Sequence, residues 1–99
     1  MIIWKYPIPI RGDGHEIIEI PTGFERFLSV QLQHGEPILW VMVSQDAPKL
    51  RWHFHWVGTG HDVPEVVQQA DGDTYIGTVQ VGAFVFHLFH SGYESTEAS

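Results

Sequence analysis

Apolar and polar residues alternate with a period of two along most of this chain, and this alternation is the feature that most constrains its fold. In the segment FLSVQLQ, residues 27–33, the alternation predicts that Leu28, Val30 and Leu32 face the core and that the residues between them face solvent. No long window shows the apolar stripe of an amphipathic helix. The sequence therefore predicts an all-β protein.

About seven short strands separated by turns are expected, which is typical of a small antiparallel β-sandwich or barrel. The predicted strands are residues 2–10, 15–20, 27–33, 38–43, 50–57, 74–81 and 83–90. Pro7 and Pro9 cannot donate hydrogen bonds to a neighbour, so they indicate a strand at a sheet edge or the end of a strand. The segment ILWVMV is apolar on both faces, which predicts a central strand.

Turns are predicted at RGDG (residues 11–14), PTGFE (21–25) and HGEP (34–37), from their glycine and proline content. The longest irregular segment follows residue 57 and is expected to contain one helical turn after Pro64. Long loops in compact domains are usually functional or mobile, so this loop is a candidate for function.

The length and composition allow one domain. The chain has 99 residues, 43% of them hydrophobic, which is enough for a packed core. A single β domain is expected over residues 1–91 and a disordered acidic tail over 92–99. The chain has no cysteine, which excludes disulfides and thiolate metal sites. Its apolar start is too short to span a membrane, so a cytoplasmic protein without a membrane partner is expected.

The chain is acidic, with a formal net charge of −7 and only five lysine and arginine residues, which form no cluster. Binding to the phosphates of nucleic acid requires clustered positive charge. Duplex nucleic acid is therefore not an expected partner.

The segment RWHFHWVGTGH, residues 51–61, holds three histidines, one arginine and two tryptophans. On a strand, the aromatic residues at even positions point to one face, which is expected to be core. Arg51, His53 and His55 point to the other face. Arg51 is expected to pair with a carboxylate or, in the sharper alternative, with an anionic ligand.

His53 and His55 share a face, as the imidazole ligands of sheet-based metal sites do, but such a site needs a third ligand. His87, His90 or His61 supplies it if the last strand lies beside this one. Cupin-type barrels follow such a pair with a nearby glutamate, which this chain lacks. Ordinary surface or half-buried sheet histidines are the favoured interpretation, and no cofactor is expected.

The segment GTGH, residues 58–61, lies where a strand ends and the long loop begins. Glycines allow backbone N–H groups to approach a phosphate or ribose closely, and Thr59 and His61 add hydrogen-bonding groups. The alternative is a tight strand exit in which the glycines serve only turn geometry. No nucleophile elbow, Walker loop or dinucleotide fingerprint is present, so an enzyme is not expected.

Several segments together resemble a family of short, uncharacterised proteins found in phages and prophages, over roughly residues 3–90. They are WKYPIPI, EIPTG, LSVQLQHGEPILWVMVSQDAP, GTGH, YIGTVQ and VFHLF. The resemblance implies a viral origin and a β fold, without an activity. Residues 58–61 and His87 match the family pattern, whereas His53 and His55 stand where related sequences carry other residues.

Taken together, these observations predict a non-enzymatic binding protein with a counter-defence role, which sequesters a small nucleotide immune signal and forms a homo-oligomer. The expected ligand-binding residues are Arg51, Trp56, Gly58, Thr59, Gly60, His61, Tyr75 and His87. The alternative is a protein inhibitor of a host defence effector, such as a CRISPR complex, which the acidic charge favours. A second alternative is a metal-dependent β-barrel enzyme that uses His53, His55 and His87.

Overall fold

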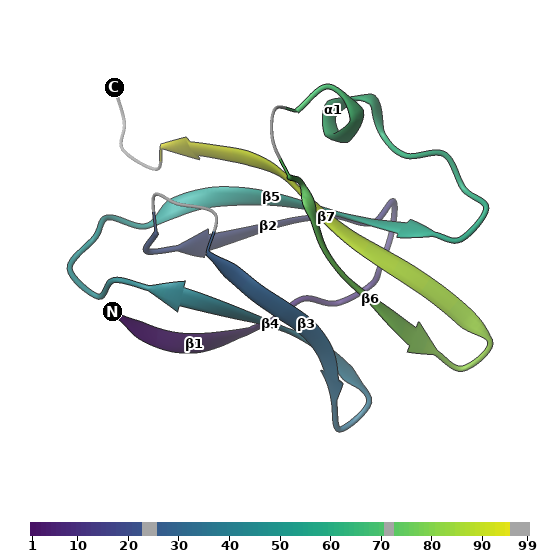
Figure 1. Cartoon of the computed structure of the whole chain (residues 1–99), viewed down its shortest axis with the longest axis horizontal. Coiled ribbons are helices and arrows are strands. Elements are labelled where there is room, and N and C mark those ends of the chain that lie inside the picture. The colour runs from purple at the N-terminus through teal and green to yellow at the C-terminus, as the bar shows by residue number, and fades with distance from the viewer. Residues whose placement is uncertain (23–25, 71–72, 96–99) are drawn as a thin grey trace.

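The structure is a computed structural model that describes residues 1–22, 26–70 and 73–95. It is all-β, as the alternation predicted, and consists of two antiparallel sheets packed face to face (Figure 1). The elements are β1 (Ile2–Pro7), β2 (His15–Ile20), β3 (Phe27–Gln33), β4 (Glu36–Val43), β5 (Leu50–Gly58), α1 (Glu65–Gln68), β6 (Tyr75–Val81) and β7 (Phe84–Ser95).

The smaller sheet has the strand order β1–β4–β3. Its central strand β4 contains the segment ILWVMV, and β1 lies at the edge, so both predicted positions in the sheet are confirmed. β1 ends at Pro7, earlier than the predicted end at residue 10. The larger sheet has the order β2–β5–β7–β6, which places β2 at an edge where its sheet partner is β5. Strands β1 and β2 follow each other in the chain but belong to different sheets.

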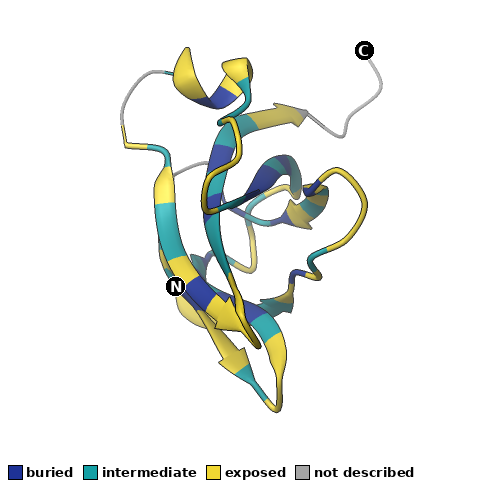
Figure 2. Ribbon diagram, turned by 90° about the vertical axis from the view of Figure 1, so that its right-hand side faces the viewer, coloured by how far each residue is buried: buried dark blue, intermediate teal, exposed yellow. Residues whose placement is uncertain are grey.

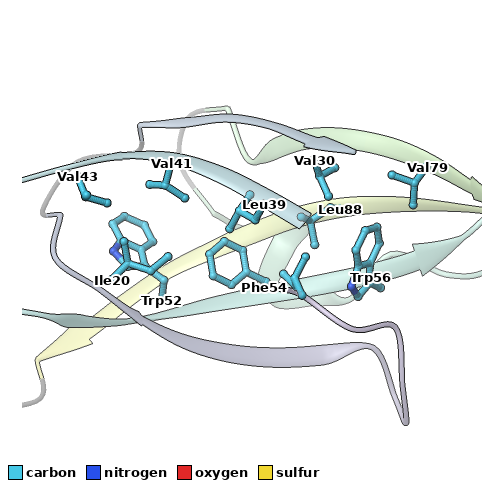
Figure 3. Packing of buried hydrophobic residues seen from close by; sticks show 11 residues of the cluster. Ile20, Val30, Leu39, Val41, Val43, Trp52, Phe54, Trp56, Val79 and Leu88 are labelled. Carbon is cyan, nitrogen blue, oxygen red and sulfur yellow. The ribbon is translucent and has the colours of Figure 1, made fainter. Parts of the chain in front are cut away.

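The core lies between the two sheets. Trp52, Phe54 and Trp56 of β5 are only 1%, 0% and 5% exposed, which confirms the predicted inner face of this strand. They form a row that packs against residues of the opposite sheet, among them Leu39 and Val41 of β4 (Figure 3). Helix α1 follows Pro64, as predicted, and buries Val67 while its other residues remain exposed (Figure 2).

Two predicted core positions are wrong, because Leu28 and Leu32 of β3 are 47% and 39% exposed. The pairing of β3 with β4 is shifted between Phe27 and Ser29, so Leu28 is an extra residue in a β-bulge. Leu32 pairs with Pro37 next to the β3–β4 turn, at the end of the sheet. Val30, between them, is buried as expected.

The last strand is longer than predicted. β7 continues to Ser95, which pairs with Leu50, so residues 92–95 are strand where the sequence predicted a disordered tail. Residues 96–99 of that tail, and residues 23–25 of the predicted PTGFE turn, lie outside the described part of the chain. Within the three described ranges, no helix is long and apolar enough to cross a membrane.

Candidate functional site

A cavity of about 440 Å³ opens to solvent where the loop before β2 meets the end of β5. It is lined by residues 10–14, Trp56, Gly58, His61 and Phe86. We call it the Trp56 cavity. Three of the predicted ligand-binding residues, Trp56, Gly58 and His61, therefore lie together, and the predicted RGDG turn forms the facing wall.

Gly14 is the point at which the loop of residues 10–14 contacts β5. Its carbonyl oxygen accepts a hydrogen bond from the Trp56 backbone N–H at 2.9 Å, and its own N–H donates to the Arg11 carbonyl at 2.9 Å. The φ angle of Gly14 is +84°, and a Cβ at this position would lie 2.5 Å from the Trp56 carbonyl oxygen. Only glycine allows the loop to approach β5 this closely.

The indole N–H of Trp56 has no hydrogen-bond partner within the described part of the chain. Trp56 is 5% exposed, and its Nε1 atom is buried with no acceptor among the described residues. Buried donors nearly always find an acceptor, and leaving one unsatisfied costs about 1–3 kcal/mol. Trp56 also lines the cavity, so a buried donor without an acceptor belongs to a residue of the cavity wall.

The charged groups of the cavity wall come from the turn. The Arg11 Nε atom lies 2.7 Å from Glu16 Oε1, in an ion pair whose arginine side chain is 73% exposed and whose glutamate is 11% exposed. A guanidinium carries five N–H donors, so this pair leaves donors of Arg11 at the cavity mouth. The Asp13 carboxylate accepts a hydrogen bond from the backbone N–H of His15 at 3.0 Å.

The GTGH turn uses its backbone groups internally. The Thr59 N–H donates to the Val85 carbonyl and the His61 N–H donates to the Gly58 carbonyl, each at 3.0 Å. These two amides therefore do not face a phosphate, and the tight strand exit is the interpretation that the geometry supports. Gly60 adopts a φ of +89° within this exit.

Thr59, Tyr75 and His87, which the sequence also proposed as ligand-binding residues, form a separate hydrogen-bonded chain. His87 Nε2 lies 2.8 Å from Thr59 Oγ1, and His87 Nδ1 lies 2.9 Å from Thr78 Oγ1. Thr78 in turn contacts the Tyr75 hydroxyl. His87 pairs with Val57, so it lies on the opposite face of the sheet from Trp56, and this chain does not line the cavity.

Arg51 lies at the other end of β5, about 23 Å from Gly58 at the usual rise per strand residue. Its Nη1 atom is 3.3 Å from Glu94 Oε1, so the carboxylate partner expected for this arginine is present. The structure does not bring Arg51 to the GTGH turn. The single pocket predicted from the sequence is therefore divided among three places.

A third imidazole joins His53 and His55, but it comes from β2 and not from the predicted residues. His15 Nε2 lies 2.9 Å from His53 Nδ1, and the His15 ring stacks on that of His55 at 4.8 Å between centroids. We call these three residues the imidazole cluster. His55 is 8% exposed, which corrects the prediction that it reaches water, and burial together with the charges of His15 and His53 lowers its pKa.

β7 does lie beside β5, as the metal hypothesis required, but its histidines are placed elsewhere. His87 faces Val57, whereas His90 points into the core and is 4% exposed. Across residues 1–22, 26–70 and 73–95, no group of three or more histidine, aspartate or glutamate side chains has an arrangement that holds a metal ion.

Sequence reasoning missed Arg11, Asp13 and His15. The sequence predicts only a turn at RGDG, because the place of this turn beside Trp56 depends on the pairing of β2 with β5, in which His15 lies opposite His55. The one signal in the sequence for this wall of the cavity was an arginine, Arg11, in a turn with two glycines.

The chain belongs to a family described as a domain of unknown function (DUF7352), whose family model matches residues 1–98. The match covers both the Trp56 cavity and the imidazole cluster. No curated protein and no solved structure matches the chain.

Proposed function

We propose that this protein is a non-enzymatic ligand-binding protein that holds a small nucleotide-type molecule in the Trp56 cavity. The observation that carries this proposal is that Trp56, which lines a solvent-open cavity, has a buried indole N–H with no acceptor among the described residues. The resemblance to phage proteins adds a biological role, which is the sequestration of a nucleotide immune signal in the bacterial cytosol.

The size and lining of the cavity suit such a ligand. Small-molecule sites measure about 300–1,000 Å³ and combine apolar walls with a few polar groups. The Trp56 cavity has about 440 Å³, which is in the lower part of this range. Ile10 and Phe86 provide apolar walls, and Phe86 meets the Trp56 ring edge to face at 6.5 Å. We expect the ring system of a nucleobase to pack against these walls.

Arg11 takes the role of phosphate partner that the sequence assigned to Arg51. Its guanidinium is mostly exposed at the cavity, but Glu16 and Asp13 place two carboxylates in the same turn and strand start. One guanidinium against two carboxylates, in a chain of net charge −7, disfavours a ligand with many negative charges. We therefore expect a ligand with one or two phosphodiester charges rather than a polyphosphate.

Isothermal titration calorimetry and thermal shift with cyclic dinucleotides, cyclic trinucleotides and ADP-ribose test the proposal. A ligand present at 100 times its Kd adds about 2.7 kcal/mol to the free energy of unfolding. Trp56→Phe removes the indole N–H and should weaken binding about two- to tenfold, the usual value of one hydrogen bond. Trp40→Phe, a half-buried position on β4 away from the cavity, is the matched control and should leave the Kd unchanged.

A second pair of variants tests the charged partner. Arg11→Ala should weaken nucleotide binding, whereas Arg51→Ala, at the far end of β5, should not. Circular dichroism checks that each variant is folded. If none of the three nucleotide classes binds the wild-type protein, or if Arg51→Ala alone weakens binding, the assignment of the cavity is wrong.

A second candidate function is the inhibition of a host defence protein. Ile3 and Trp4 are 57% and 58% exposed on the edge strand β1, and exposed apolar residues on an edge strand favour contact with a partner. Inhibition of DNA cleavage by a purified CRISPR effector, abolished by Trp4→Ala, would support this function. No inhibition by the wild-type protein would remove it.

A further inference from the structure

The imidazole cluster lies on the outer face of the larger sheet, and two of its residues, His15 and His55, are chain neighbours of the cavity residues Gly14 and Trp56. His15 is the first residue of the edge strand β2, and His53 and His55 are its cross-strand neighbours on β5. The ring centroids of His15 and His53 are 5.1 Å apart. We propose that this cluster is an acid-sensitive latch that holds the cavity wall, residues 10–14, against β5 and releases it when a second proton binds.

The charged and polar groups around the cluster come from every neighbouring element. From β7, Glu94 lies 3.4 Å from His53 Nε2, and Ser91 Oγ lies 2.7 Å from His55 Nε2. From β5, Arg51 shares the Glu94 carboxylate, and from β2, Glu19 lies opposite Arg51. From the loop, the Asp13 carboxylate acts on His55 with opposite sign to the two other histidines.

This arrangement accommodates one proton. A protonated His53 donates from Nδ1 to His15 Nε2 and from Nε2 towards Glu94, so both of its N–H groups have an acceptor. The carboxylate balances the charge, and neutral His15 serves as the acceptor. One positive charge therefore strengthens the contact between β2 and β5.

A second proton does not fit. Protonation of His15 sets two N–H donors against each other across 2.9 Å and places two positive charges about 5 Å apart. His55 offers no relief, because burial and its charged neighbours lower its pKa, and its Nε2 is engaged with Ser91. The repulsion therefore acts across the β2–β5 pair.

The strain falls on the cavity wall because the two sites share a stretch of backbone. His55 is followed by Trp56, and His15 is preceded by Gly14. The Trp56 N–H donates a hydrogen bond to the Gly14 carbonyl, so the two histidines flank this contact. β2 is an edge strand, so its start can separate from β5 without disrupting another strand. The latch rests on the proposed function only for the ligand that is released, since the movement itself needs no ligand.

Hydrogen exchange of the Trp56 amide, measured by NMR on the free protein, tests the latch. We expect its protection factor to fall about tenfold between pH 7.5 and pH 5. The free energy that corresponds to this fall lies between the repulsion energy of the two charges in water and their repulsion energy at a partly buried site. His15→Gln keeps a neutral hydrogen-bonding group and should reduce this fall to less than about twofold. His34→Asn removes a histidine from the β3–β4 turn and should keep the wild-type fall.

Two results would overturn the proposal. One is the same loss of Trp56 protection in wild type and His15→Gln. The other is a loss that occurs only together with the amide of Leu39, in the opposite sheet, because that would be unfolding of the whole domain. Neither readout uses a nucleotide, so a failure of the latch is distinguishable from a failure of the proposed ligand.

Discussion

Replacing Gly14 with alanine should remove a large part of the stability of this domain. The residue has a φ of +84°, and an added Cβ would lie 2.5 Å from the backbone oxygen of Trp56. Backbone oxygen cannot move aside as the end of a flexible side chain can. The loop must therefore lift from β5, which lengthens the hydrogen bond from the Trp56 N–H to the Gly14 carbonyl.

The size of the effect follows from two contributions. A left-handed conformation costs an alanine about 1–2 kcal/mol relative to glycine. Overpacking of a close contact typically costs about 1–3 kcal/mol more. We expect Gly14→Ala to lower the free energy of unfolding by about 2–5 kcal/mol, a large fraction of the roughly 5–15 kcal/mol that stabilises a domain.

Gly12→Ala, in the same turn, is the matched control. Gly12 also has a positive φ, +57°, but an added Cβ meets nothing within 4 Å. Both substitutions reduce the freedom of the unfolded chain equally, so this term cancels in the comparison. Urea denaturation should show Gly14→Ala less stable than Gly12→Ala by about 1–3 kcal/mol. Equal midpoints would refute the close approach of Gly14 to Trp56.

Two further predictions concern the core and the imidazole cluster. Phe54→Ala should lower the free energy of unfolding by about 3–5 kcal/mol because Phe54 is 0% exposed, whereas Phe84→Ala, at a residue 69% exposed, should change it by less than about 0.5 kcal/mol; urea denaturation measures both. Because the folded state lowers the pKa of His55, the unfolded chain binds more protons below about pH 6.5, and stability should fall as the pH drops through that value. Denaturation at pH 7.5 and 5.5 should show a smaller fall for His55→Gln than for wild type; an equal fall would assign the effect to other groups.

The fold class followed from local patterns because burial in a sheet is periodic. The even positions of β5 are apolar, and all three aromatic side chains among them are buried. A bulge interrupts this alternation, and its extra residue, Leu28, is exposed although Val30 beyond it is buried as predicted. The prediction of a disordered tail at the end of β7 was wrong for another reason. Its composition is polar, but the Tyr93 ring packs against that of Trp52 with centroids 4.8 Å apart, and Glu94 pairs with Arg51. Both contacts depend on a strand distant in sequence.

The candidate site was predictable only in part, because residues that are close in the sequence can lie on opposite faces of a sheet. Trp56 and Thr59 are three residues apart, but Trp56 lines the cavity, whereas Thr59 bonds to His87 behind the sheet. His87 pairs with Val57, and this register assigns it to the outer face. No local pattern contains that register, so the sequence could not predict that Trp56 and His87 lie on opposite faces of the sheet.

The position of the cavity follows from the path of the chain between the two sheets. β1 ends in one sheet and β2 begins in the other, so residues 8–14 must cross the open end of the sandwich. Ile8 is fully buried and bonded to the Pro37 carbonyl, which anchors the start of the crossing in the core. Beyond it, the glycines of the turn bring no side chains to fill the space above Trp56. Because the chain must come close enough to β5 to contact it at Gly14, it leaves a hollow beside this contact, and Trp56 lies in the wall of that hollow.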